Sequence, residues 1–278
     1  MSITMPIIDD RIELKFEDHI AHVSLARPEK MNALDAKMII AIPKVGELIL
    51  DNPEVRCVVL SGQGDNFCAG LDKSNFEAVL TNQSKDDSQP ALISNLLERT
   101  NGIANQFQYV AWMWRELPMP VVAALDGMVL GGGLQIALGA DMRIAHPDST
   151  FSILEMKWGL IPDMSSTQIM RHMVRDDVIR ELTYTARMFS AQEAKEWGFI
   201  THISDDPLAH ANKLAKQIVM QNPDAVQAAK RVIDQSYYQT AAEGLLTESI
   251  EQDKVMGTPN QLEAIMSVMQ KRAPNFRD

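Results

Sequence analysis

The feature that most constrains the fold is a unit that occurs twice, made of a buried strand, a glycine-rich loop and a helix. The first unit begins with the apolar run VRCVVL at 55–60, which leads into the loop SGQGDNFCAG. The second begins with VVAAL at 121–125, which leads into DGMVLGGGLQIALGAD. Short apolar runs that alternate with glycine turns and helices are typical of an α/β protein. The repeat therefore predicts an α/β body.

Further elements can be read on either side of these units. Alternating apolar residues at 12–16 and 21–25 predict a hairpin, and Asp35 can cap a helix that runs to about Leu50, with Pro43 kinking or shifting it. A short helix is expected at 72–80. A polar surface loop that could border a binding site is expected at 81–90, and a helix at 91–116.

The chain becomes helical after residue 165. Ser190 and Glu193 form the pattern of a capping box, and Gly198 is a helix stop. We therefore divide the chain into a core at 1–200 and a C-terminal helical region at 201–278.

Composition excludes several classes of function. The net charge of -11 disfavours binding to nucleic acid or to an anionic membrane. The two cysteines do not make a disulfide scaffold, and the N-terminus lacks the pattern of a signal peptide. These observations predict a cytoplasmic protein with no membrane partner.

Motifs for other chemistries are missing from the sequence. A dinucleotide fingerprint fails at Ile136, where a glycine or alanine is required, and no phosphate loop, HExxH or GxSxG is present. Cys68 has no identifiable base partner, and His172 stands isolated, so ordinary structural roles are expected for both. We expect no metal site.

The two glycine loops suggest a site for an anionic oxygen. Helix N-termini leave backbone N–H groups unpaired and carry partial positive charge, so two such turns that face each other can form an oxyanion hole.

Four motifs in order resemble the crotonase, or enoyl-CoA hydratase/isomerase, superfamily. They are RPEKMNALD at 27–35, NFCAGLD at 66–72, PVVAALDGMVLGGGLQIALGADMRIA at 120–145 and FSILEMKWGLIPD at 151–163. The resemblance implies a spiral of ββα units with a C-terminal helical region for trimerisation, in homotrimers or dimers of trimers. It also implies an acyl-CoA substrate, with coenzyme A entering as part of that substrate and no separate cofactor.

The resemblance also assigns residues to roles. The backbone N–H groups of Leu71 and Gly132 would hold the thioester oxygen, where losing one donor typically costs about 3 kcal/mol of transition-state stabilisation. The loop from Lys30 to Leu34 would lie along the CoA nucleotide, although Lys30 could equally be a solvated turn residue. The set expected to contact the substrate or CoA is Lys30, Ala33, Ala69, Asp72 and Gly131.

Two positions decide which reaction is expected. Hydratases of this family use two glutamates, but the first position here is Gln135, whose amide cannot act as a base and can only hydrogen-bond. The second is Glu155, in apolar surroundings that should raise its pKa. One carboxylate beside an oxyanion hole suffices to move a proton between two carbons, which favours double-bond isomerisation.

Asp163 stands where dienoyl-CoA isomerases carry a second catalytic aspartate, so enoyl and dienoyl isomerisation remain open. Asp163 could instead cap the helix that follows it. The sequence also leaves open a hydratase with weakened water activation, thioester hydrolysis or decarboxylation, and a non-catalytic CoA-binding homologue.

Overall fold

The computed structural model describes residues 3–4, 7–72, 92 and 95–278. In this part of the chain the strands form one sheet in the order β1-β2-β3-β4-β5-β7-β10 and a smaller sheet in the order β6-β8-β9. The strands are β1 (Ile3–Thr4), β2 (Ile12–Glu17), β3 (Ile20–Leu25), β4 (Cys57–Gly62), β5 (Val121–Leu125), β6 (Met128–Leu130), β7 (Met142–Ala145), β8 (Thr150–Ser152), β9 (Phe189–Ser190) and β10 (His202–Ile203).

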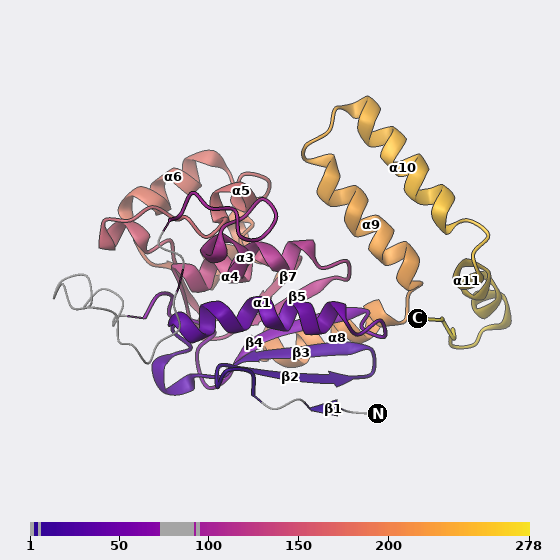
Figure 1. The fold of residues 1–278 in the computed structure, drawn as a ribbon, viewed down its shortest axis with the longest axis horizontal. Helices are drawn as coiled ribbons and strands as arrows, with labels where there is room; N and C mark the ends of the chain where they lie inside the picture. Colours follow the sequence, from indigo (N-terminus) through magenta and orange to yellow (C-terminus); the bar gives the residue numbers. More distant parts are fainter. Residues whose placement is uncertain (1–2, 5–6, 73–91, 93–94) are drawn as a thin grey trace.

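Helices cover the sheets and form the C-terminal part of the molecule (Figure 1). They are the 3-10 turns η1 (Pro28–Lys30) and η2 (Glu155–Trp158), and the α-helices α1 (Ala36–Leu50), α3 (Gln106–Glu116), α4 (Gly132–Gly139), α5 (Ser166–Met170), α6 (Asp176–Thr185), α7 (Ala191–Trp197), α8 (Pro207–Val219), α9 (Pro223–Ser236), α10 (Ala241–Val255) and α11 (Pro259–Gln270).

The main sheet confirms the α/β prediction. β2 and β3 form the expected antiparallel hairpin, and β3, β4, β5, β7 and β10 are parallel neighbours. Side chains alternate between the two faces of β4, as strand geometry requires. Val58 and Leu60 join the large core that includes α1 and α3, whereas Val59 packs with Ala211 and Ala215 of α8. Burial on both faces explains the continuous apolar run in the sequence.

The helix predicted from Asp35 is present in full. The Asp35 side chain accepts a hydrogen bond from the Met38 N–H, and α1 continues to Leu50 as one helix. Pro43 lies inside α1 and does not end it. The capping box of Ser190 and the stop at Gly198 are also confirmed at the two ends of α7.

The helix predicted at 91–116 is wrong over residues 95–105, which the structure describes as turns and irregular chain. α3 begins at Gln106, where the Asn105 side chain accepts from the Gln108 N–H and the Gln108 side chain accepts from the Asn105 N–H. Before it the chain makes turns, with Gly102 at a φ of +57°. A reciprocal capping box and a left-handed glycine both stop helix propagation toward the N-terminus.

Two predicted elements, the helix at 72–80 and the loop at 81–90, lie outside the described residues except for Asp72. The proposed division near residue 200 remains a prediction. α8 packs on the main sheet, so the helices that extend away from it begin with α9. We call α9, α10 and α11 the C-terminal arm (Figure 1).

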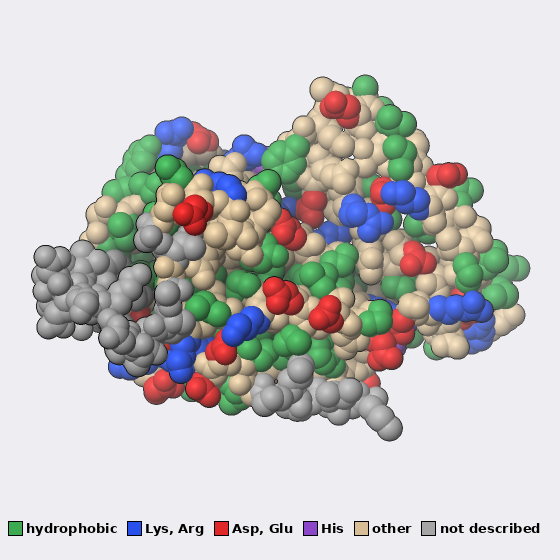
Figure 2. Space-filling model, in the orientation of Figure 1, with side chains coloured by type: hydrophobic (Ala, Val, Ile, Leu, Met, Phe, Trp, Pro, Cys, Tyr) green, Lys and Arg blue, Asp and Glu red, His purple; other side chains and the backbone are tan. Residues whose placement is uncertain are grey.

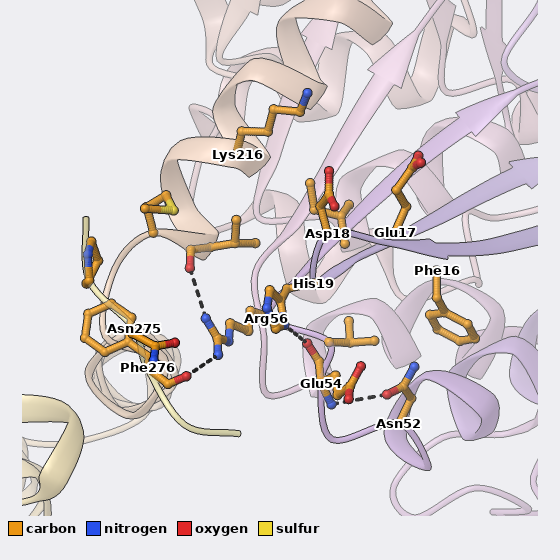
Figure 3. A pocket seen from close by; sticks show the side chains of 15 residues that line it. Phe16, Glu17, Asp18, His19, Asn52, Glu54, Arg56, Lys216, Asn275 and Phe276 are labelled. Atoms are coloured by element: carbon orange, nitrogen blue, oxygen red, sulfur yellow. Dashed lines mark hydrogen bonds between the residues drawn. The ribbon is translucent and has the colours of Figure 1, made fainter. Parts of the chain in front are cut away.

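The chain returns from the arm to the main sheet (Figure 3). Arg56 donates to the carbonyl oxygens of Phe276, at 3.0 Å, and Val219, at 3.4 Å, and it forms an ion pair with Asp278. This one guanidinium therefore joins the tail after α11 to the end of α8.

No helix among the described residues is both long and apolar enough to cross a membrane.

Candidate active site

Three segments that run in parallel end at one edge of the small sheet. β6 pairs in parallel with β8, and the segment around Cys68 forms a parallel bridge with Val129 of β6. The N–H of Gly131 donates to the Ser152 carbonyl oxygen at 2.9 Å, which continues this pairing beyond both strands. Because the carboxyl ends of parallel strands meet at one edge, the residues that follow the three segments lie together. The fold thereby brings Glu155 and the two glycine loops to the same edge, with the loop that follows β6 in the middle.

A cavity of about 570 Å³ lies at this edge. Nine of the ten predicted site residues line it, namely Lys30, Ala33, Ala69, Leu71, Asp72, Gly131, Gly132, Glu155 and Asp163. Much of the remaining wall is apolar, from Leu130, Leu154, Trp158, Leu160, Met164 and Met188. The tenth residue, Gln135, is buried and contacts Glu155. An apolar pocket with a few convergent polar groups is the usual form of a small-molecule site.

Two backbone donors are available in the cavity wall. Leu34 donates to the Gly70 carbonyl oxygen at 2.8 Å and accepts from the Asp72 N–H at 3.0 Å. The Leu71 N–H between them points to the other side of the chain. Gly132 is the first residue of α4, where a helix offers no internal acceptor. Within the described residues neither N–H makes a hydrogen bond, so both can bind an anionic oxygen.

Two glycines allow these groups to approach one another. Gly70 has a φ of +85°, and a Cβ there would lie 2.7 Å from the Leu130 carbonyl oxygen and 3.4 Å from the Gly132 nitrogen. Gly131 has a φ of +49°, and its Cβ would lie 3.3 Å from Glu155 Oε1. Only glycine combines this backbone conformation with such close approach.

Glu155 begins η2, which Ile153 and Leu154 separate from the end of β8, and the residue as a whole is half-buried in the cavity wall. Its Oε2 atom is buried and has no hydrogen-bond partner within the described residues. Burial raises the pKa of Glu155, and the nearby Asp163 charge raises it further, against the lowering effect of hydrogen bonds from its own N–H and from Gln135. A carboxyl group with a raised pKa is suited to accept and return protons near neutral pH.

Gln135 holds the other carboxylate oxygen. Its Nε2 donates to Glu155 Oε1 at 2.6 Å. Its Oε1 accepts from the N–H groups of Met164, at 2.9 Å, and Ser166, at 3.3 Å. Two N–H donors fix which end of the amide carries the oxygen, so the NH₂ group must face Glu155. Gln135 does not itself line the cavity, and it takes part in the site through this hydrogen bond to Glu155.

Asp163 caps no helix, so the capping role considered for it is wrong. The residue before α5 is Ser165, and no side chain caps that helix. Asp163 instead lines the same cavity as Glu155, and partial burial raises its pKa even though much of the side chain is exposed. The cavity thus holds a second carboxyl group besides that of Glu155.

The residues expected to contact the substrate or CoA all line the cavity, and they differ in how exposed their side chains are. Lys30 ends η1 and is exposed, Ala33 is buried and Ala69 is half-buried. Asp72 also lines the cavity, and its carboxylate forms a 2.5 Å ion pair with Arg27. Arg27 was not among the predicted site residues, since 45 residues separate the two partners.

The remaining candidates have structural surroundings. Burial raises the pKa of the Cys68 thiol to about 12, which keeps it protonated and unreactive as a nucleophile. The His172 ring stacks on Tyr237 with ring centres 4.3 Å apart. No three His, Cys, Asp or Glu side chains in the described parts of the chain are grouped as metal ligands.

Comparison with known proteins agrees with this geometry. The family model for enoyl-CoA hydratase/isomerase matches residues 15–278. The putative enoyl-CoA hydratase/isomerase YngF of Bacillus subtilis (strain 168) is 32% identical over 263 residues, which cover 94% of this chain and 95% of YngF. The peroxisomal Delta(3,5)-Delta(2,4)-dienoyl-CoA isomerase of Arabidopsis thaliana is 27% identical, over 94% of this chain and 93% of that protein.

A solved structure, that of a putative enoyl-CoA hydratase from Streptomyces coelicolor A3(2), superposes with a TM-score of 0.85 at 25% identity, over 98% of this chain and 96% of the other. The mixed α/β architecture with C-terminal helices is thus the crotonase fold. The chain belongs to the enoyl-CoA hydratase/isomerase family of the crotonase superfamily.

Proposed function

We propose that this enzyme moves a carbon–carbon double bond in an enoyl-CoA or dienoyl-CoA thioester, with Glu155 as the proton shuttle. The observation that carries the proposal is the pairing of Glu155 with Gln135. The amide occupies Oε1 and is itself held by Met164, which leaves the buried Oε2 as the free proton acceptor of this pair. One free carboxylate oxygen next to two N–H donors is the minimum that isomerisation requires.

The proposed reaction begins with the thioester oxygen between the N–H groups of Leu71 and Gly132. Glu155 Oε2 removes a proton from C2 of a 3-enoyl chain, and negative charge develops on the thioester oxygen. The two donors stabilise this charge because they are already oriented before it forms. The electron pair of the C3–C4 double bond then takes the proton back at C4, which leaves a C2–C3 double bond and a neutral product.

A dienoyl substrate is the second candidate, favoured by the position of Asp163. Moving two conjugated double bonds by one position requires proton return at C6, farther from the thioester than C4. Asp163 lines the same cavity as Glu155 and has a raised pKa, so it could serve the distal carbon. Hydration is less well supported, because the amide of Gln135 cannot take a proton from water.

We extend the proposal to CoA binding and assembly. Lys30, which is exposed at the cavity, would bind a phosphate of CoA.

The enzyme would form a homotrimer or a dimer of trimers through the C-terminal arm. Large apolar side chains are exposed on this arm (Figure 2), among them Leu245, Leu246, Met256, Val268 and Met269. Apolar surface of this extent is typical of protein interfaces. Light scattering should give a trimeric or hexameric mass, and a stable monomer would contradict the assembly.

The test of the reaction offers 3-enoyl-CoA, 3,5-dienoyl-CoA and trans-2-enoyl-CoA to the purified protein in separate assays. Ultraviolet absorbance follows conjugation, and mass spectrometry follows water addition or loss of the thioester. We expect isomerised product without added water. Rapid hydration of trans-2-enoyl-CoA would replace this proposal with the hydratase, and CoA binding without turnover would favour the non-catalytic homologue.

The matching variant is Glu155→Gln, which keeps the size of the side chain and removes its proton-accepting oxygen. Turnover should fall by about 10²- to 10⁴-fold, the usual contribution of a general base. Affinity for a saturated acyl-CoA should stay within about twofold, since the backbone donors are untouched. A variant with wild-type turnover would remove Glu155 from the mechanism.

A further inference from the structure

Two peptide units lie in series behind the Leu71 N–H. The Gly70 carbonyl oxygen, which belongs to the same peptide unit as that N–H, accepts from the Leu34 N–H at 2.8 Å. The Ala33 carbonyl oxygen, which belongs to the same peptide unit as the Leu34 N–H, accepts from Arg27 Nη1 at 3.0 Å. In a trans peptide the C=O and N–H bonds point in opposite directions. The hydrogen bonds therefore run in one direction, from Arg27 to the cavity.

The guanidinium at the start of this series is held in place by a carboxylate. Arg27 Nη1 also contacts Asp72 Oδ2, and the two side chains are only 13% and 12% exposed. Arg27 lies 3.8 Å from Asp35 as well, and its N–H donates to the Asn32 side chain at 2.8 Å. Solvent screens such a partly buried ion pair only weakly. Separating the two side chains would leave a desolvated charge without its partner, which costs free energy, so the guanidinium is held in one position.

Asp72 has a second link to the same segment. It directly follows Leu71, and its own N–H donates to the Leu34 carbonyl oxygen at 3.0 Å. The Arg27–Asp72 pair thus ties the loop at 27–34 to the segment that carries Leu71, next to the backbone bridge between Leu34 and Leu71.

We infer that Arg27 is a positioning residue that orients and polarises the Leu71 N–H through the peptides at 33–34 and 70–71, with Asp72 holding Arg27 in place. A cation at the start of a hydrogen-bonded chain polarises each bond after it, which strengthens the last donor. The inference rests on the proposed function, because it assumes that Leu71 binds the thioester oxygen. It reassigns Asp72 from contact with CoA to support of the oxyanion site.

The test measures the bound thioester itself, so that it does not depend on turnover. Infrared difference spectroscopy on a saturated acyl-CoA, labelled with carbon-13 at the carbonyl, reports how strongly the site polarises that bond. In the wild type we expect a shift to lower frequency on binding. Arg27→Met should reverse part of the shift, and Asp72→Asn should have a smaller effect in the same direction.

Kinetics supply the second readout. Loss of alignment of one donor should lower kcat by about 10- to 100-fold, with a much smaller change in KM, and Arg27→Lys should recover part of the rate. The control is Asp234→Asn, which breaks another partly buried ion pair, that with Arg115 between α3 and α9. This control should leave the carbonyl frequency unchanged.

The outcomes separate this inference from the proposed function. Glu155→Gln should keep the full carbonyl shift while losing turnover. If no isomerisation is found but the shift is present and Arg27→Met reduces it, the proposed reaction fails and the inference stands. A folded Arg27→Met or Asp72→Asn protein with the wild-type carbonyl frequency would overturn the inference.

Discussion

At the scale of single residues, the site depends on how one amide is oriented. Gln135 could have turned either end of its side chain toward Glu155. The N–H groups of Met164 and Ser166 determine which, because both can bond only to the amide oxygen. The NH₂ group is left to hold the Glu155 carboxylate. In the sequence Gln135 stands where hydratases of the family have a glutamate; in the structure it is a hydrogen-bond donor to Glu155.

The raised pKa of Glu155 predicts a pH-dependent effect on stability. A group with a higher pKa in the folded state contributes stability below its unfolded pKa, and this contribution is lost as pH rises through the folded pKa. This contribution diminishes as pH rises above the unfolded pKa, so the buried carboxyl group favours the folded state less near neutral pH than in acid. Glu155→Gln should raise the Tm near neutral pH and leave it unchanged below about pH 4. Thermal unfolding of both proteins across this pH range measures the difference in Tm. The same increase in Tm at every pH would show that the raised pKa is not its cause.

Gln135→Glu should change both pH dependence and product. It places a second carboxylate where the amide nitrogen now lies 2.6 Å from Glu155 Oε1. Two carboxylates at that distance share a proton, so the apparent pKa of the pair rises and the acid limb of kcat/KM moves to higher pH. A second ionisable group should also raise hydration of trans-2-enoyl-CoA, by about 10²-fold. An unchanged pH profile would show that the two side chains separate in the variant.

At the scale of secondary structure, the small sheet and the turns around it assemble the site. β6 and β8 run in parallel, so the chain leaves both at the same edge, once into α4 and once into η2. β6 and β8 are both short strands, and many of the residues that line the cavity lie in the loops that follow them. Backbone hydrogen bonds between these loops, rather than regular helices or strands, fix the cavity wall.

The start of α3 offers a direct test of an element boundary. Asn105 and Gln108 form a reciprocal capping box. Asn105→Ala removes the cap, and it should lower the free energy of unfolding by about 1 kcal/mol. Chemical denaturation measures this, with Gln252→Ala as the control, because Gln252 is exposed inside α10 and caps no helix there. If α3 instead began near residue 91, Asn105→Ala would be neutral or stabilising.

At the scale of the whole molecule, the C-terminal arm is attached to the core by charged groups. Lys230 of α9 is buried, and its Nζ lies 2.9 Å from Asp141 Oδ2 and 3.0 Å from the Met119 carbonyl oxygen. This contact joins the arm to the start of β7. It is the kind of buried pair whose loss is costly because the remaining partner stays desolvated.

Lys230→Met should therefore destabilise the protein by about 3 kcal/mol, since Asp141 is left without its cation. The exposed Lys254, which pairs with Glu251 within α10, provides the control, because Lys254→Met should change stability by less than about 1 kcal/mol. Urea denaturation of the two variants gives the comparison. Equal effects would show that Lys230 does not secure the arm.

The sequence by itself determined the elements whose signals are local. The alternation at 12–25 predicted the hairpin, Asp35 predicted the start of α1, and the two strand–glycine–helix units predicted the α/β body. The predicted site residues were also found together, because ordered motifs carry the resemblance to the family. Where a local signal misled, as at 91–116, a capping box at Asn105 in the structure overrode the expected helix.

Tertiary structure alone decided which atoms of those residues are free. The amide orientation of Gln135, its hydrogen bond to Glu155 Oε1 and the ion pair between Arg27 and Asp72 all depend on partners at least 20 residues away in the chain. No periodicity or spacing records such contacts, because hydrogen bonding and burial depend on distance in space. The sequence thus determined which chemical groups the enzyme has, and the fold determined which of them can react.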